Sequence, residues 1–259
     1  MMCIKILGNG GAINNGLSYN AFVINQTLLC ETPPDIMLSL HQNGIDISSI
    51  NTIYISHLHG DHTFGLPFLM LSAFFRHFKS GDRLPYTIVG PEGLEEMAQD
   101  LVISAFTARH HCLKWMKEFC TFVEVDESSK PDLLQGYQAS LFKLNHLVDT
   151  FGFSLAKDDR VEFAYVADTL WCESISTVLG SRPQVVLIDL NGQDNDPDRV
   201  HLAMSDLKQK AIPITGDDTQ YYGTHLVDEF ESTMPCIRCA KPGMVISLKS
   251  EGSQNVHPQ

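Results

Sequence analysis

Three histidines and an aspartate are crowded into Ser56–His62, directly after Thr52–Ile55, a short β-branched run typical of a strand. A strand that ends in a polar turn is a place where a rigid scaffold presents ligands. In an extended turn the first two histidines can share one metal ion, while the aspartate and the last histidine reach a second position beside it. Imidazole and carboxylate groups suit zinc, manganese or iron rather than calcium. The alternative is a polar loop with incidental histidines; the candidate ligands are His57, His59, Asp61 and His62.

The composition indicates an acidic globular chain. Its 259 residues are 44% hydrophobic, which is enough for one large domain with a sizeable core. We therefore expect one domain over residues 1–259, with a frayed tail at 249–259. The chain carries 18 Lys plus Arg against 31 Asp plus Glu, a net charge of −13, which disfavours tight nonspecific binding of nucleic acid.

No segment has the pattern of an export signal or a membrane span. The first ten residues contain no apolar stretch of signal-peptide length, and the most apolar window, Leu66–Phe78, has only 13 residues. Seven scattered cysteines give no disulfide framework. We expect a cytoplasmic protein without a membrane partner.

Strand and helix patterns alternate along the chain. Strands are predicted at Cys3–Leu7, Val185–Leu190 and Ala211–Thr215, and helices at Gly65–Lys79 and His201–Lys210. The pattern divides into two αβ halves, each with its own sheet. This organisation predicts a layered α/β sandwich rather than one doubly wound sheet.

The His-x-His-x-Asp-His pattern at residues 57–62 resembles the signature of the metallo-β-lactamase superfamily. Three further motifs are similar to later superfamily motifs and occur in the same order: Leu144–His146, Tyr165–Thr169 and Gly223–Leu226. The resemblance implies a four-layer αββα metallo-β-lactamase sandwich. It also implies one metal ion on His57, His59 and His146, a second on Asp61, His62 and His225, and Asp168 with a hydroxide bridging the two.

Each distant ligand has a structural alternative. His146 could be a loop histidine, Asp168 the N-cap of a helix at Leu170–Leu179, and His225 a residue of a first helical turn. Their order and their positions at the ends of predicted strands favour metal binding. Asp189 also ends a predicted buried strand, and we interpret it as a residue that orders the scaffold.

A further histidine indicates one branch of the superfamily. The true β-lactamases usually have Cys where Asp168 stands, and flavo-diiron enzymes have Glu in place of His59. His201 is similar to the histidine of the ribonuclease Z and carbon–phosphorus lyase phosphodiesterase branch, which opens a helix, contacts phosphate and assists the leaving group. An ordinary helix residue is the alternative. Gly8–Ala12 also resembles the glycine-rich opening of that branch.

This resemblance implies a dinuclear metal-dependent hydrolase that cleaves a small phosphodiester through a metal-bridging hydroxide. Its cofactors would be two divalent ions, zinc first with manganese or iron as alternatives, and its catalytic residues would be Asp61 and His201. The competing hypotheses are a ribonuclease Z-like tRNA 3′-endonuclease, a lactonase or other carboxylic-ester hydrolase, and a non-enzymatic metal-binding protein. The acidic charge and the lack of a Gly/Pro-rich insertion like a tRNA-binding arm make nucleic acid the less favoured substrate, without excluding it.

Three features stay open at this level. Glu31 stands where the superfamily commonly has Asp, so it is at most a partial substitute. Cys236 and Cys239 have the spacing of a zinc knuckle, but no second pair accompanies them. A set of phenylalanines after the metal loop predicts core packing, with a homodimer contact or a pocket wall as alternatives: Phe64, Phe68, Phe74, Phe75 and Phe78.

Overall fold

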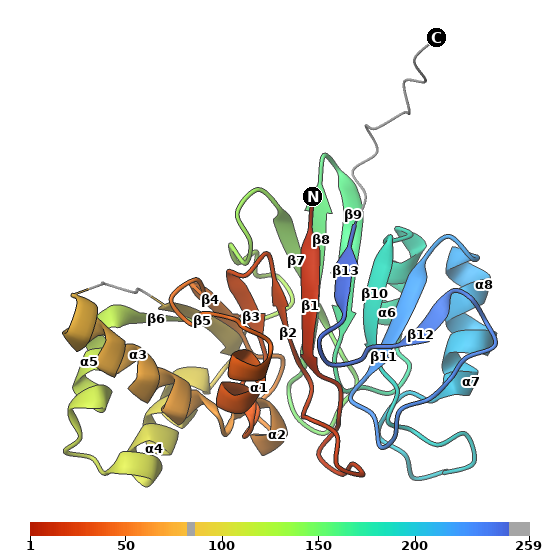
Figure 1. Ribbon diagram of the computed structural model, residues 1–259. Helices are drawn as coiled ribbons and strands as arrows, with labels where there is room; N and C mark the ends of the chain where they lie inside the picture. Colours follow the sequence, from red (N-terminus) through yellow and green to blue (C-terminus); the bar gives the residue numbers. More distant parts are fainter. Residues whose placement is uncertain (82–85, 249–259) are drawn as a thin grey trace.

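The computed structural model describes residues 1–81 and 86–248, so the predicted frayed tail at 249–259 lies outside the described residues. Two β-sheets pack face to face, and helices cover both outer sides (Figure 1). The predicted αββα sandwich is therefore confirmed. That residues 1–259 form one domain stays a prediction.

The first sheet has seven strands. From one edge to the other they are β13 (Val245–Ser247), β1 (Cys3–Gly8), β2 (Ala21–Ile24), β3 (Leu28–Cys30), β4 (Thr52–Tyr54), β5 (Tyr86–Pro91) and β6 (Cys120–Val125). Strands β3 to β6 are parallel, whereas β13, β1, β2 and β3 pair antiparallel.

The second sheet has six strands. In order they are β12 (Ile237–Cys239), β11 (Gln220–Thr224), β10 (Val185–Asp189), β9 (Arg160–Val166), β8 (Phe151–Lys157) and β7 (Gln138–Lys143). Strands β9 to β12 are parallel, and β8 runs opposite to both β7 and β9. Strands β7, β9, β10 and β11 thus share one direction, so the segments that follow them leave the sheet at the same edge.

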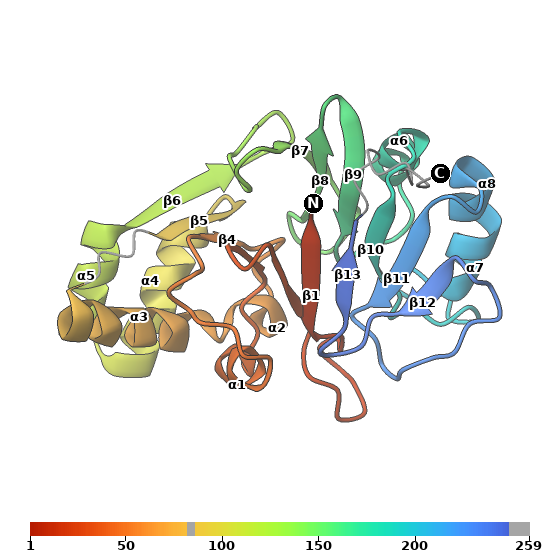
Figure 2. The same cartoon turned by 45° about the horizontal axis from the view of Figure 1, so that its top comes forward.

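The helices of the two halves lie on opposite sides of the sandwich (Figures 1 and 2). Those on the first sheet are α1 (Ile36–Gln42), α2 (Gly60–Thr63), α3 (Leu66–Ser80), α4 (Leu94–Phe106) and α5 (His111–Phe119). Those on the second are α6 (Glu173–Gly180), α7 (Met204–Asp206), the π-helical turn η1 (Leu207–Ala211) and α8 (Ile212–Thr215).

Alternation of side chains along the strands divides the core into two layers. In the first sheet, Ile53 and Ile88 belong to the cluster under the helices, whereas Tyr54 and Val89 belong to the cluster that the second sheet completes. Between the sheets, aromatic rings meet edge to face, as Phe22 does with Tyr165 at a centroid distance of 4.9 Å. In the second sheet, every residue of β10 is buried, which explains why its sequence is apolar from Val185 to Ile188.

After β10, one predicted strand is wrong and one predicted helix begins later than expected. The strand predicted at Ala211–Thr215 is helical, because it continues the helical stretch that begins at Met204 and runs through η1 into α8. The helix predicted from His201 begins only at Met204, so His201 lies in the preceding loop.

Helix α3 carries an exposed aromatic face. Of the five phenylalanines that the sequence analysis singled out, only Phe74 is buried. The α3 face consists of the four others, which are at least half exposed: Phe64 just before the helix and Phe68, Phe75 and Phe78 on it. Core packing is therefore wrong for four of them, and the homodimer and pocket-wall alternatives stay predictions. Among the helices of residues 1–81 and 86–248, none is long and apolar enough to cross a membrane.

Candidate metal centre

The histidine-rich segment is placed by the carboxyl end of β4. His57 is fully buried beneath the turn, and His59 stands as the residue before α2, where its carbonyl accepts a hydrogen bond from the Thr63 hydroxyl at 2.8 Å. Asp61 and His62 then lie within the single turn of α2. A short extended turn followed by one helical turn therefore gives the four predicted ligands two different directions.

The second sheet supplies the remaining predicted residues from strand ends that share one direction. His146 follows β7, Asp168 follows β9, and His225 follows β11. His146 does lie in a loop, whereas Asp168 and His225 do not have the helix roles that were their structural alternatives. Helix α6 begins only at Glu173 with Cys172 before it, which excludes Asp168 as its N-cap, and His225 lies in a loop rather than in a first helical turn.

Three imidazoles form a first group, made of His57, His59 and His146. His57 Nε2 lies 3.0 Å from His59 Nδ1, and His146 Nε2 lies 3.4 Å from the same atom. Burial lowers the pKa of His57 and of His146, so both rings are neutral at neutral pH. Three ring nitrogens that face one another cannot all donate to each other, but all three can bind a single cation.

A second group combines two carboxylates and two imidazoles: Asp61, His62, Asp168 and His225. His225 Nε2 lies 3.1 Å from Asp61 Oδ2 and 3.2 Å from Asp168 Oδ2. Burial alone would lower the pKa of His225, but Asp168 and the other carboxylates raise it to about 10. The site thus concentrates negative charge in the interior and favours a positive charge between its members.

Unsatisfied polar atoms agree with metal binding. Among the described residues, both ring nitrogens of His62, Nδ1 of His146 and Oδ1 of Asp168 are buried without a hydrogen-bond partner. Such atoms are rare in native structures and costly unless a ligand completes them. Asp168 also lies between the two groups, since its Oδ2 is 3.8 Å from His57 Nε2. The donor atoms therefore fit two neighbouring divalent ions.

His201 lies beside the second group and is held by Asp189. Its Nδ1 donates to Asp189 Oδ2 at 2.9 Å, and its ring centroid is 5.0 Å from that of His225. Burial lowers the pKa of His201, but the neighbouring Asp189 carboxylate outweighs it and raises the pKa. The side chain keeps 19% exposure, so a substrate at the metal groups can reach it.

Asp189, which the sequence analysis interpreted as a residue that orders the scaffold, also contacts the candidate site residues. It does order the scaffold, since its carboxylate accepts from the backbone N–H groups of Thr169 and Asn191 at 3.1 and 3.0 Å. It also contacts His201 and, at 3.5 Å, Nδ1 of His225. Asp189, Asp168, His201 and His225 are close enough to hold an ion themselves. The backbone hydrogen bonds and the 2.9 Å contact with His201 instead fit a residue that orients imidazoles.

Backbone strain marks the same place. His225 and Glu31 have φ angles of +57° and +67°, a left-handed conformation that costs energy for residues with a side chain. The glycine-rich loop fits tightly above them: a Cβ on Gly11 would lie 2.1 Å from Asn191 Nδ2 and 2.9 Å from His225 Cε1. Gly11 thus allows the backbone to approach the site, as its resemblance to the branch's opening loop implies.

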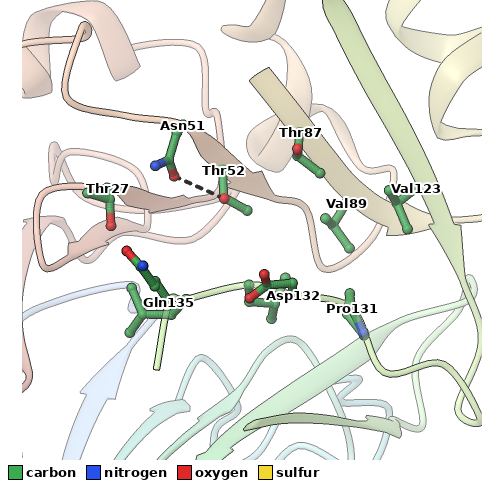
Figure 3. Close-up of a pocket in the computed structure, with 11 residues that line it drawn as sticks. Thr27, Asn51, Thr52, Thr87, Val89, Val123, Pro131, Asp132 and Gln135 are labelled. Atoms are coloured by element: carbon green, nitrogen blue, oxygen red, sulfur yellow. Dashed lines mark hydrogen bonds between the residues drawn. The ribbon is translucent and has the colours of Figure 1, made fainter. Parts of the chain in front are cut away.

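Two other features lie outside this centre. A cavity of about 470 Å³ opens at the amino ends of β4 and β5, away from the metal loop, and Figure 3 shows Thr52 and Thr87 facing Asp132 across it. None of its lining residues is a predicted site residue. Cys236 and Cys239 belong to no group of three ligands among the described residues, so the zinc-knuckle interpretation finds no support.

The comparisons with known proteins agree with this geometry. Ribonuclease Z from Staphylococcus carnosus (strain TM300) is 34% identical over 113 residues, which are 44% of this chain and 33% of that protein. The match therefore spans about a third of the length of such curated relatives. Among solved structures, the metallo-β-lactamase fold protein YhfI from Bacillus subtilis has a TM-score of 0.74 at 14% identity, covering 95% of this chain and 98% of that one. Human tRNase Z, short form, has a TM-score of 0.73 at 18% identity, covering 96% and 100%.

A family model described as the anti-Pycsar protein Apyc1 matches residues 2–228, a range that contains every residue of both metal groups. The ribonuclease Z relatives and the shared fold confirm the predicted side of the metallo-β-lactamase superfamily. The chain belongs to the anti-Pycsar protein Apyc1 family.

Proposed function

We propose that this protein is a dinuclear metal-dependent phosphodiesterase that hydrolyses a small phosphodiester, such as a cyclic nucleotide. The observation that carries the proposal is the meeting of two ligand groups at Asp168, one of imidazoles alone and one of mixed imidazoles and carboxylates. Two adjacent cation sites suit a phosphate, whose oxygens gain negative charge as the ester bond breaks.

In this proposal His57, His59 and His146 hold one ion, Asp61, His62 and His225 hold the other, and Asp168 serves both. When bound, the ions supply a hydroxide nucleophile near neutral pH and neutralise charge on the phosphate. Zinc is the first candidate, with manganese or iron as alternatives, because imidazole and carboxylate ligands accept all three.

Asp61 acts on the attacking water, and His201 acts on the leaving group. Asp61 is the most exposed member of its group, with 12% of its side chain accessible, so its carboxylate can accept a hydrogen bond from the attacking water and orient it. His201 donates Nδ1–H to Asp189, which leaves its Nε2 as the nitrogen that can give a proton to the departing alkoxide. The raised pKa of His201 favours the protonated ring that this step requires.

The experiment is hydrolysis of bis(p-nitrophenyl) phosphate by protein reconstituted with zinc or manganese, followed by a screen of cyclic nucleotides. We expect metal-dependent turnover that a chelator abolishes. His111→Ala is the matched control, because this histidine is exposed at the start of α5 and belongs to neither group. Protein that holds two ions but does not cleave any phosphodiester would refute the proposal and favour a carboxylic-ester hydrolase such as a lactonase.

The second candidate is a ribonuclease Z-like tRNA 3′-endonuclease, which the 34% identity to ribonuclease Z over 113 residues favours. The net charge of −13 argues against it, because a polyanion needs clustered Lys and Arg. Cleavage of precursor tRNA with steep salt dependence would establish this function in place of the first.

Two proposals concern the state of the protein in the cell. The exposed phenylalanines of the α3 face would be covered in a homodimer, and light scattering coupled to size-exclusion chromatography tests this; a strict monomer would remove it. All seven cysteines are free, which suits the reducing cytoplasm that we propose as its location.

A further inference from the structure

Glu31 is a fully buried carboxylate directly after β3, in a strained backbone conformation. Its backbone N–H donates to the Tyr54 carbonyl at 2.8 Å, which fixes the chain at this point. A buried carboxylate is costly unless charged or hydrogen-bonding partners surround it. The partners of the Glu31 carboxylate therefore indicate its role.

The carboxylate of Glu31 lies against His62, a member of the second metal group. Its Oε2 is 3.3 Å from His62 Nδ1, an ion-pair contact rather than a hydrogen bond, and no other carboxylate of the described residues comes within 4 Å of that nitrogen. The opposite ring nitrogen, Nε2, faces Asp61 and Asp168 at 3.4 and 3.5 Å. One nitrogen of His62 thus faces Glu31 and the other faces the centre of the group.

Glu31 is itself held by groups from both sheets. The backbone N–H of Ser56 contacts both carboxylate oxygens at 3.3 Å, and the Tyr165 hydroxyl of β9 donates to Oε1 at 3.0 Å. Asn20 donates to the same hydroxyl at 2.9 Å and accepts from Thr224, the neighbour of His225, at 2.6 Å. A buried hydrogen-bonded chain therefore runs from beside His225 to Glu31, whose carboxylate then faces His62.

We propose that Glu31 is a positioning residue that holds His62 with the proton on Nδ1, so that Nε2 is free to bind the second metal ion, and that Tyr165 and Asn20 hold Glu31 in place. This inference rests on the proposed function, since it assumes that His62 is a metal ligand. An ionised carboxylate has no proton to donate, so at 3.3 Å it favours the ring form that carries hydrogen on Nδ1. Glu31 thereby fills the place of the usual superfamily Asp with a residue one methylene longer.

The test is Glu31→Gln, which keeps the size of the side chain but adds an amide that can donate to Nδ1. We expect the affinity for the second zinc ion to fall by about 10- to 100-fold, as for other partners of metal-binding histidines, while the first ion binds as before. Competition with a chromophoric chelator measures both constants. In the zinc-loaded protein, long-range ¹H–¹⁵N spectra of labelled histidine should show hydrogen on Nδ1 of His62 in the wild type and lose that signal in the variant.

Tyr165→Phe is the second variant, because it keeps the ring that packs on Phe22 and removes only the hydroxyl. We expect a smaller loss of second-ion affinity, about 3- to 10-fold. Tyr86→Phe is the matched control: its ring is equally buried, and its hydroxyl donates to the Ile47 carbonyl, away from the site. The control should bind both ions with wild-type affinity.

The outcomes separate this inference from the proposed function. A wild-type protein that binds two ions, with Glu31→Gln and Tyr165→Phe binding the second equally well, would overturn the role of Glu31 and leave the dinuclear centre standing. Hydrogen on Nε2 of His62 in the wild type would overturn it as well. A wild-type protein that binds fewer than two ions would overturn the proposed function, and the role of Glu31 with it.

Discussion

The two ligand groups of this protein are built in different ways. His57, His59 and His146 form a group of imidazoles in which two members are partly exposed. Asp61, His62, Asp168 and His225 mix charges, three of the four are buried, and further carboxylates lie behind them. Metal binding by the first group would depend on three ring nitrogens that point toward one another. Metal binding by the second would depend on buried carboxylates and on imidazoles that neighbouring carboxylates orient.

This difference predicts where substitutions act. In the first group the imidazoles themselves carry the binding, so removal of one ring should remove the ion. In the second group the supporting residues Glu31 and Asp189 touch the ligands directly, so changes one layer away should also be felt. We therefore expect metal binding by the imidazole group to depend on its three ligands, and metal binding by the mixed group to depend on supporting residues as well.

The largest effect is expected from His59→Ala. His59 Nδ1 is the atom to which both other nitrogens of the first group are close, so its loss leaves two rings without a common partner. Metal analysis should show loss of metal, and turnover should fall by more than about 10³-fold, beyond the loss of one hydrogen-bond donor. Retained turnover would contradict the dinuclear account.

His201→Ala should separate catalysis from metal binding. The ring lies beside the second group without being needed to complete it, so two ions per chain should remain. Turnover of phosphodiesters should fall by about 10²- to 10³-fold, the scale of one general acid. An unchanged rate on phosphodiesters would refute the role of His201. Lactones are the comparison substrate, because a lactonase is expected to keep its rate when His201 is removed.

Asp189→Asn should cost less, about 10- to 100-fold in turnover, because the residue acts through the imidazoles it orients. If it acts mainly through His201, the same change in a His201→Ala background should have a much smaller effect. A double-mutant cycle of initial rates measures this coupling. If the losses in turnover from the two substitutions are fully additive, Asp189 instead acts by ordering the scaffold or by orienting His225.

Asp206→Asn should have the smallest effect on turnover, below about 10-fold, with a loss of about 2 kcal/mol in the free energy of unfolding. Asp206 accepts from Arg199 at 2.5 Å and from the Ala203 backbone at 3.0 Å, and so holds the loop that contains His201. Burial would raise the pKa of this carboxyl, but hydrogen bonds from Arg199 and Lys210 lower it to about 2.

Because the folded-state pKa of Asp206 is lowered, the stability it contributes is present above about pH 4 and is lost as the pH falls toward 2. Urea unfolding of the wild type and the variant should therefore differ equally at pH 7 and pH 5, and the difference should shrink below pH 4. A difference that stays constant down to pH 3 would show that the charge of Asp206 contributes nothing.

The candidate ligands that are close together in the sequence were easier to predict than those that come from distant segments. His57 to His62 are contiguous, so their spacing alone indicated two directions of metal binding. His146, Asp168 and His225 needed the motif order of a resembling superfamily, since only the shared direction of β7, β9 and β11 brings them together. The layered fold followed from the alternation of strand and helix patterns.

The missed features depend on tertiary contacts. The pattern at Ala211–Thr215 is as suitable for a strand as for a helix, and the segment is helical because it continues the stretch that begins at Met204. Asp189 gave a signal, a carboxylate at the end of a buried strand, but its contact with His201 depends on a loop 12 residues later. For Glu31 the sequence showed only that it stands where the superfamily commonly has Asp. Its role could not be predicted, because its partners Tyr165 and His62 come from different sheets.

The most direct test of the two-group account is anomalous diffraction from crystals grown with zinc. The account predicts two neighbouring peaks, one within bonding distance of His57, His59 and His146 and the other within bonding distance of Asp61, His62 and His225, with Asp168 reaching both. A single peak held by Asp189 and His201 would contradict it.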